Sequence, residues 1–168
     1  MKKTLLGLLV LGLTSQGFSQ IVQTEKLSEV VVTAVNYKYL DATTNEEVAL
    51  PVKKLAQAAA SYNIKESELY SDEYEFYTIS FFIPEGQIVA IYNPDGQIIR
   101  TVEKFKNIKM PNAVAKAVKD TYPKWDVESD VYLVSYTNDK GAKKTYKLKL
   151  KNGDKRMRVK VDETGTFL

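Results

Sequence analysis

Hydrophobic and polar positions alternate along several segments of this chain, a pattern typical of strands in a sheet that buries one face. Alternation, together with many β-branched and aromatic residues, predicts strands at 29–40, 74–83, 87–92, 97–105 and 131–136. After these, residues 146–161 predict a hairpin whose turn is Asn152-Gly153-Asp154. Two other segments have apolar residues at helical spacing, and each begins at a proline, Pro51 or Pro111.

The predicted elements follow each other twice in the same order. The tyrosines near the ends of the two predicted helices have the same separation as Pro51 and Pro111. Beyond the helices, similar residues recur at a longer, constant spacing, for example Tyr77 with Tyr146 and Gly96 with Gly165. We therefore predict an α+β fold of tandem αβββ repeats, at about 48–105 and 108–168. They would form one antiparallel sheet of about 7–8 strands with two helices packed on one face. Chance similarity between two amphipathic hairpins is the alternative.

Successive side chains of a strand point to opposite faces of its sheet, which divides the last hairpin into two sets. One set is apolar and is predicted to face the helices: Tyr146, Leu148, Leu150, Met157, Val159 and Val161. The other set is entirely basic: Lys147, Lys149, Lys151, Arg156, Arg158 and Lys160. Like charges that face each other across strands are unfavourable, so the second set indicates either a site for an anionic partner or a solvated outer face.

The corresponding side of the first repeat has a different character. It carries Thr78 and Ser80 together with three large apolar residues, Phe82, Val89 and Ile91. Apolar residues on an outer face need a cover or a partner. Two interpretations remain open: the N-terminal segment or a loop covers them, or they form a protein-binding patch beside the basic residues.

The N-terminus has the layout of a secretory signal peptide. Lys2 and Lys3 precede an apolar run at 5–13, and a polar stretch follows, which predicts a signal peptide at 1–19. The predicted cut lies between Ser19 and Gln20 and leaves a single domain at 20–168, periplasmic or secreted. A buried N-terminal helix is the alternative. No later apolar run is long enough to span a membrane.

Charge is distributed unevenly along the chain. Residues 20–96 carry 5 basic and 12 acidic side chains, whereas residues 97–168 carry 17 basic and 9 acidic side chains. This asymmetry allows the acidic half of one copy to meet the basic half of another, so weak self-association is a second hypothesis. Nucleic acid is a poor candidate partner, because the chain is predicted to be exported.

Several kinds of chemistry are excluded or disfavoured by residue type. The chain has no histidine and no cysteine, which excludes histidine-based triads, thiolate nucleophiles, disulfides and a lipid-modified N-terminal cysteine. No glycine-rich phosphate-binding motif is present. The acidic cluster of Asp72, Glu73 and Glu75 lacks the spacing of a calcium loop. We therefore predict no catalytic residue, no metal and no cofactor.

A family resemblance is carried by the second repeat. Met110-Pro111-Asn112-Ala113-Val114 followed by Tyr122-Pro123-Lys124-Trp125, and then by DVYLVSY and KKTYKLKLKNGDKRMRVKVDETGTFL, resembles the PepSY-like family, also described as beta-lactamase-inhibitor-like. The similarity covers 100–168 and is weaker over 50–99, where Tyr62-Asn63-Ile64 replaces Tyr-Pro. No inhibitor contact motif is recognisable, so no binding residue is transferred.

The resemblance implies tandem repeats in one sheet, export to the periplasm and a non-enzymatic binding or inhibitory role. Some similar proteins bear the label of nicotinate-nucleotide adenylyltransferase, an enzyme that needs a His-x-Gly-His site which a chain without histidine lacks. Our first hypothesis is therefore an exported binding module that contacts a periplasmic or envelope protein, or an anionic envelope partner, through its open sheet face. The alternative is a structural, self-associating envelope protein, and an enzyme of unrecognised type is the weakest hypothesis.

Overall fold

The computed structural model describes residues 36–168. The predicted signal peptide, its cleavage site and residues 29–35 of the first predicted strand lie outside the described residues. The helices are α1 (Tyr37–Thr43), α2 (Leu50–Ser61), the short 3-10 helix η2 (Ile64–Glu66) and α3 (Asn112–Thr121). The strands are β1 (Tyr77–Ile83), β2 (Gly86–Tyr92), β3 (Ile98–Lys106), β4 (Asp126–Thr137), β5 (Gly141–Asn152) and β6 (Lys155–Asp162).

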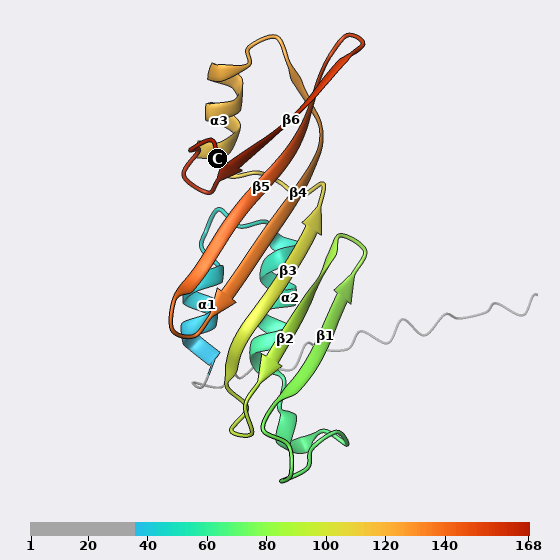
Figure 1. Ribbon diagram of the computed structural model, residues 1–168, viewed down its shortest axis with the longest axis vertical. Helices are drawn as coiled ribbons and strands as arrows, with labels where there is room; N and C mark the ends of the chain where they lie inside the picture. The colour runs from blue at the N-terminus through green and yellow to red at the C-terminus, as the bar shows by residue number, and fades with distance from the viewer. Residues whose placement is uncertain (1–35) are drawn as a thin grey trace, which may run out of the picture.

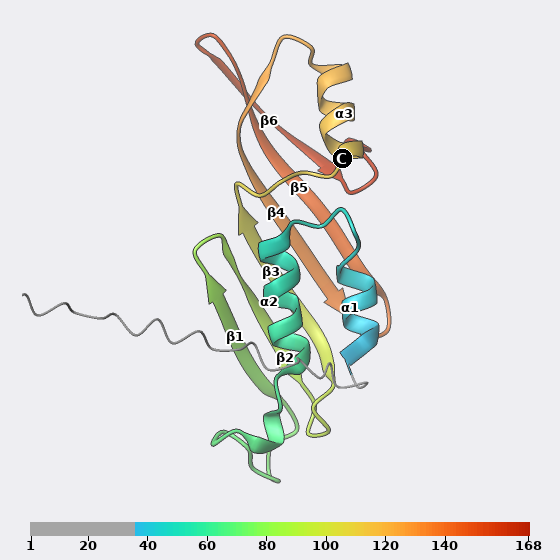
Figure 2. The same cartoon turned by 180° about the vertical axis from the view of Figure 1, so that it is seen from behind.

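The strands form one open antiparallel sheet in the order β1-β2-β3-β4-β5-β6. Each strand pairs with the next strand in sequence, so the sheet is a continuous meander. The α-helices lie on one face of this sheet, as the two opposite views show (Figures 1 and 2). The other face carries no element of the described chain (Figure 1).

The hydrophobic core lies between the sheet and the helices. Alternate residues of the strands point into it, including Phe105, Tyr132, Leu148 and Val161, all of which are fully buried. The alternation read from the sequence is therefore confirmed in β5 and β6, where the predicted core set is buried or half-buried. Burial of these large apolar side chains is the main contribution to the stability of the fold.

The two helices predicted from proline are confirmed. In α2, Pro51 lies in the first turn, where its missing N–H leaves no intrahelical bond unmade. Ala56, Ala59 and Ala60 are fully buried, and such small side chains let the helix backbone approach β1 and β2 closely. In α3, Val114 and Val118 form the buried stripe.

The strand predicted for residues 29–40 is wrong over its last part, because Tyr37–Thr43 is the helix α1. Contacts distant in sequence favour this helix. The Asn36 side chain donates to the carbonyls of Ala60 and Gly96 (both 3.0 Å), and its Oδ1 accepts from the Ile98 N–H at 2.7 Å. Tyr39, near the start of α1, is buried against β3 and β4. Local β propensity is a weak preference that such contacts override.

The predicted sheet of 7–8 strands with two helices is corrected to six strands with three α-helices in the described chain. One difference is α1, which begins within the last part of the expected first strand. The other is the C-terminus, where Phe167 forms only an isolated bridge to Val161 and no further strand. The additional strand expected around 131–136 is present as β4.

The β1–β2 and β5–β6 hairpins have the same register when they are aligned at Tyr77 and Tyr146. Tyr77 faces Tyr92 just as Tyr146 faces Val161, and each of the other pairs of β1–β2 has its counterpart in β5–β6. The turns that follow also agree: Asn93 Oδ1 accepts from the N–H groups of residues 95 and 97, and Asp162 Oδ1 accepts from those of 164 and 166. The two hairpins therefore share pairing and turn geometry as well as sequence.

Candidate protein-binding face

The six basic residues predicted as a set lie together on the open face of β5 and β6. We call them the basic face: Lys147, Lys149, Lys151, Arg156, Arg158 and Lys160. Lys149 is half-buried and the other five are exposed. The register places them directly opposite each other as Lys147–Lys160, Lys149–Arg158 and Lys151–Arg156. Each pair juxtaposes two positive charges, an arrangement that costs up to about 1 kcal/mol per pair in a sheet.

One carboxylate partly compensates the basic face. The register of β4 against β5 shifts between Val127 and Ser129, so Glu128 sits at a bulge. Its two carboxylate oxygens contact Lys149 Nζ at 2.6 Å and Arg156 Nε at 3.1 Å. Hydrogen bonds from these two cations hold the pKa of Glu128 below its ordinary value.

Four cations of the basic face have no ion-pair partner among residues 36–168: Lys147, Lys151, Arg158 and Lys160. A shallow hollow of about 350 Å³ lies beside three of these four cations and is lined by Ser129, Val131, Lys147, Leu148, Lys149, Arg158, Val159 and Lys160. Its polar lining is cationic except for one serine, so the group that fits it best is an anionic one, such as a carboxylate side chain.

The sheet order extends this positive surface to residues that the sequence analysis did not single out. Lys104 and Lys106 of β3 are exposed, and their inward neighbours Glu103 and Phe105 are buried, so both lysines lie on the open face. One cross-strand row runs from Lys106 through Val131 to Lys147 and on to Lys160. Alternation within the predicted strand at 97–105 indicates the side on which Lys104 lies, whereas Lys106 follows that predicted strand. Only the strand order shows that β3 is separated from β5 by β4 alone.

The apolar set on the first hairpin is exposed to different degrees. Phe82 is 67% exposed, whereas Val89 and Ile91 are half-buried. Val102 of β3, which faces Val89 directly, is 49% exposed and enlarges the apolar area. No element within residues 36–168 covers Phe82, so of the two interpretations only cover by residues before 36 or by a partner remains.

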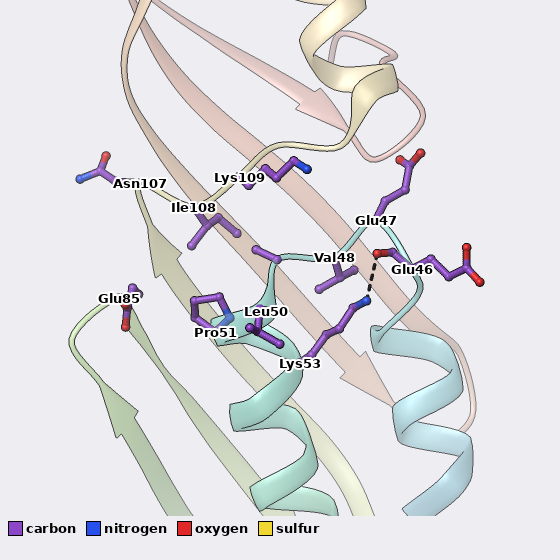
Figure 3. A pocket seen from close by; sticks show the side chains of 11 residues that line it. Glu46, Glu47, Val48, Leu50, Pro51, Lys53, Glu85, Asn107, Ile108 and Lys109 are labelled. Carbon is purple, nitrogen blue, oxygen red and sulfur yellow. Dashed lines mark hydrogen bonds between the residues drawn. The ribbon is translucent and has the colours of Figure 1, made fainter.

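A hollow of about 550 Å³ lies at the edge of the helical layer (Figure 3). It is enclosed by the α1–α2 loop, the β1–β2 turn and the segment between β3 and α3. Lys53 Nζ donates across one side of it to the Glu46 carbonyl at 2.9 Å, while the carboxylates of Glu46 and Glu47 point away from its centre (Figure 3). No acid–base pair converges on a common point here, so the hollow offers no catalytic arrangement.

A buried carboxylate lies on the other face of the sheet. Glu103 is 1% exposed, and its Oε1 accepts hydrogen bonds from the Tyr39 and Thr101 hydroxyls, both at 2.8 Å. Its Oε2 has no hydrogen-bond partner. Burial raises the pKa of Glu103 to about 7, although both hydroxyls and the positive charge of Lys144 act in the opposite direction. Because α1 covers this group, it is part of the interior and not of a substrate site.

No group of three or more potential metal ligands occurs within 36–168, and no helix there is long and apolar enough to cross a membrane. What the open face provides is a broad surface with a basic part on β3, β5 and β6 and an apolar part on β1–β3. Comparisons with family models, curated proteins and solved structures find no match to this chain.

Proposed function

We propose that this protein is a non-enzymatic binding module that holds an acidic protein surface against its open sheet face. The observation that carries the proposal is the basic face, in which three directly opposed pairs of cations have a single compensating carboxylate among residues 36–168. Repulsion within such pairs lowers the stability of the hairpin. An anionic partner reduces this repulsion, which favours binding. The adjacent Phe82, Val89 and Ile91 would add apolar contact, which a protein partner can cover.

Export is part of this proposal. The basic n-region and apolar run of residues 1–19 support a periplasmic or secreted location, with a periplasmic or envelope protein as the partner. We also infer a relationship to the PepSY-like family, supported by Met110-Pro111-Asn112-Ala113-Val114 and Tyr122-Pro123-Lys124-Trp125. The shared register of the β1–β2 and β5–β6 hairpins supports an internal duplication, with α2–β3 as one unit and α3–β6 as the other.

Charge reversal on the basic face tests the proposal. Arg158→Glu combined with Lys160→Glu removes two cations that have no ion-pair partner in the described chain. Lys54→Glu combined with Lys119→Glu is the matched control, because it makes the same change in net charge at exposed positions on α2 and α3. Capture of proteins from an envelope extract and binding of an octa-glutamate peptide are compared among the two variants and the unmodified protein.

We expect the basic-face variant to bind at least tenfold more weakly, with a loss of about 1.4 kcal/mol or more, and the control to bind as before. Thermal unfolding of both variants shows whether the fold is intact. Equal binding by the basic-face variant, the control and the unmodified protein would remove the basic face from the proposal.

A second candidate function is electrostatic self-association. Residues 66–99 contain seven acidic side chains and no lysine or arginine. The loop that holds five of them lies at one end of the molecule, and the β5–β6 turn lies at the other end (Figure 1). Contacts between unlike ends of two copies would weaken as salt screens the charges. Sedimentation at 20 and 500 mM salt tests this function, because association through unlike charged ends should decrease as salt rises.

A further inference from the structure

The two edge strands of the sheet differ in whether other residues pair with their outer side. At the β6 edge, Phe167 bridges Val161 and the Leu168 N–H donates to the Lys160 carbonyl at 2.9 Å. At the other edge, β1 pairs with β2 on one side only, and no strand of the described chain pairs with its outer side (Figure 1). Half of the N–H and C=O groups of β1 are therefore directed outward, where another strand can bond them.

The β1 edge lacks the features that usually prevent strand addition. Residues 76–83 contain no proline and no charged side chain, and the pairing of β1 with β2 has no bulge. Edge strands normally carry lysine, proline or a bulge that discourages pairing with another chain. Phe76 and Phe82, at the two ends of this segment, are 58% and 67% exposed. Within residues 36–168, the edge thus combines backbone groups that no strand pairs with and apolar side chains that no element covers.

The second hairpin shows what this edge can accept. In the alignment of the two hairpins, β5 is the counterpart of β1, and β6 is the counterpart of β2. The side of β5 that corresponds to the outer edge of β1 is occupied by β4, which runs antiparallel along nearly its whole length. A strand in the position of β1 therefore pairs on both sides elsewhere in this molecule.

The sequence of the edge is the same in both directions when residues are grouped by chemical type. Outward from Ile79, Thr78 and Ser80 are hydroxyl residues, and the next two positions on each side, 76–77 and 81–82, are aromatic. Two antiparallel copies centred on Ile79 would therefore place like beside like: Ile79 opposite Ile79, Thr78 opposite Ser80, Tyr77 opposite Phe81 and Phe76 opposite Phe82. Aromatic pairs and hydroxyl pairs across strands are both favourable.

We infer that a second copy of this chain occupies the β1 edge, joined about a two-fold axis through Ile79. The two sheets become one sheet of twelve strands, and because facing residues share a face, the helices of both copies lie on the same side. A closed two-fold contact also buries both free edges, so no edge of this kind is left to recruit a third copy.

Charge selects β1 over β6 for this contact. Pairing β6 with β6 of a second copy would bring Arg156, Arg158 and Lys160 of each chain together. Pairing β6 with β1 would set those cations opposite Phe82, Ser80 and Thr78, which offer no carboxylate. Pairing β1 with β1 places no charge within the strand. Acidic groups lie beyond its ends, for example at Glu73, Glu75 and Glu85, so salt should strengthen the dimer by screening them.

Engineered cysteines test the register, since the chain has no cysteine of its own. In the inferred pairing, Thr78 lies directly opposite Ser80 of the second copy, with Cα atoms about 4.5–5.5 Å apart, which a disulfide can bridge. Thr78 is about 8 Å or more from Thr78 of the second copy, because the two are offset by two positions. A mixture of Thr78→Cys and Ser80→Cys should cross-link under mild oxidation, and neither variant alone should do so.

Lys143→Cys is the control, because it places a cysteine on the open face of β5, away from the β1 edge. Its cross-linking measures the rate of random collision between copies. Equal cross-linking of Thr78→Cys alone and of the mixture would overturn the inferred register. No cross-linking of the mixture above the Lys143→Cys level, together with a monomer by sedimentation up to 200 μM, would overturn the dimer.

Charged variants test the edge without reference to disulfides. Thr78 and Ser80 are exposed, so replacing both by lysine leaves the core unchanged and places four cations across the dimer axis. We expect this variant, and the variant with glutamate at both positions, to dimerise at least tenfold more weakly, and a mixture of the two to recover a dimer. Persistence of the dimer in either variant alone would show that β1 is not the contact. This outcome does not depend on whether the basic face binds a partner.

Discussion

At the scale of single residues, the interior of this protein contains a polar group in an unfavourable place. Glu103 lies on the helix-facing side of β3, among positions otherwise occupied mainly by apolar residues or tyrosines. Two hydroxyl donors satisfy one carboxylate oxygen and none satisfies the other. Removing a carboxylate from water favours its neutral form, which explains why the pKa of Glu103 rises to about 7.

This shift predicts how stability depends on pH. The folded protein keeps the Glu103 proton up to about pH 7, whereas the unfolded chain loses it near the ordinary value of 4.5. Between these pH values the folded state binds more protons, so the free energy of unfolding falls as pH rises, by about 3 kcal/mol over the window. Glu103→Gln removes this titration and keeps an acceptor for Tyr39 and Thr101.

Urea unfolding at pH 5 and pH 8 measures the effect. We expect Glu103→Gln to be more stable than the unmodified protein at pH 8, and this advantage to shrink or reverse at pH 5. Parallel pH profiles of the two proteins would contradict the assignment of a raised pKa to Glu103.

At the scale of elements, the close spacing of strands depends on one glycine. Gly86 opens β2 directly opposite Phe105, and a Cβ atom there would lie 2.2 Å from the Lys104 carbonyl oxygen and 2.6 Å from Phe105 Cδ1. No real side chain tolerates such contacts, so the β1–β2 turn can approach β3 only because residue 86 is glycine. Gly141 differs, since it has a positive φ of 76° and open space around it.

The two glycines give a matched prediction. Gly86→Ala should destabilise the protein by about 3 kcal/mol, because β2 must move away from β3 or Phe105 must move within a packed core. Gly141→Ala should cost about 1 kcal/mol, the strain of a left-handed conformation alone. Denaturant midpoints of the two variants measure the difference, and equal losses would show that the contact at Gly86 relaxes easily.

At the scale of the whole molecule, charge and apolar surface are separated along the sheet. The acidic loop before β1 lies at one end, and the cations of β5 and β6 lie towards the other (Figure 1). The basic face lies on β5 and β6, and the uncharged strand β1 lies at the other end of the strand order. The strands β2, β3 and β4 separate the two. Binding on the basic face and pairing at β1 are therefore separate events on one molecule.

Salt should act on these two events in opposite directions. Raising salt from 20 to 500 mM should weaken octa-glutamate binding, because screening reduces the attraction of the basic face. The same change should strengthen the β1–β1 dimer, because it screens the acidic groups beyond the ends of each β1. Anisotropy with the peptide and sedimentation without it measure the two effects, and a common direction would indicate that a single electrostatic contact underlies both.

The sequence by itself determined most of the strands, the two helices that begin near proline and the side of β5 and β6 that is basic. These features depend on periodicity and on the backbone limits of proline, which act between near neighbours in the chain. The hairpin register was also implicit in the constant spacing between matching residues of the two repeats, since short turns fix which residues face each other.

Only the tertiary structure decided the remainder, because it depends on which segments meet. α1 forms where a strand was expected, since Asn36 and Tyr39 find partners on α2, β3 and β4 that no local pattern reveals. The strand order places Lys104 and Lys106 within the positive surface and leaves β1 at an edge of the sheet that residues 36–168 form. Long-range packing outweighs local propensity at these positions, and it is this packing that sets the surfaces available to a partner.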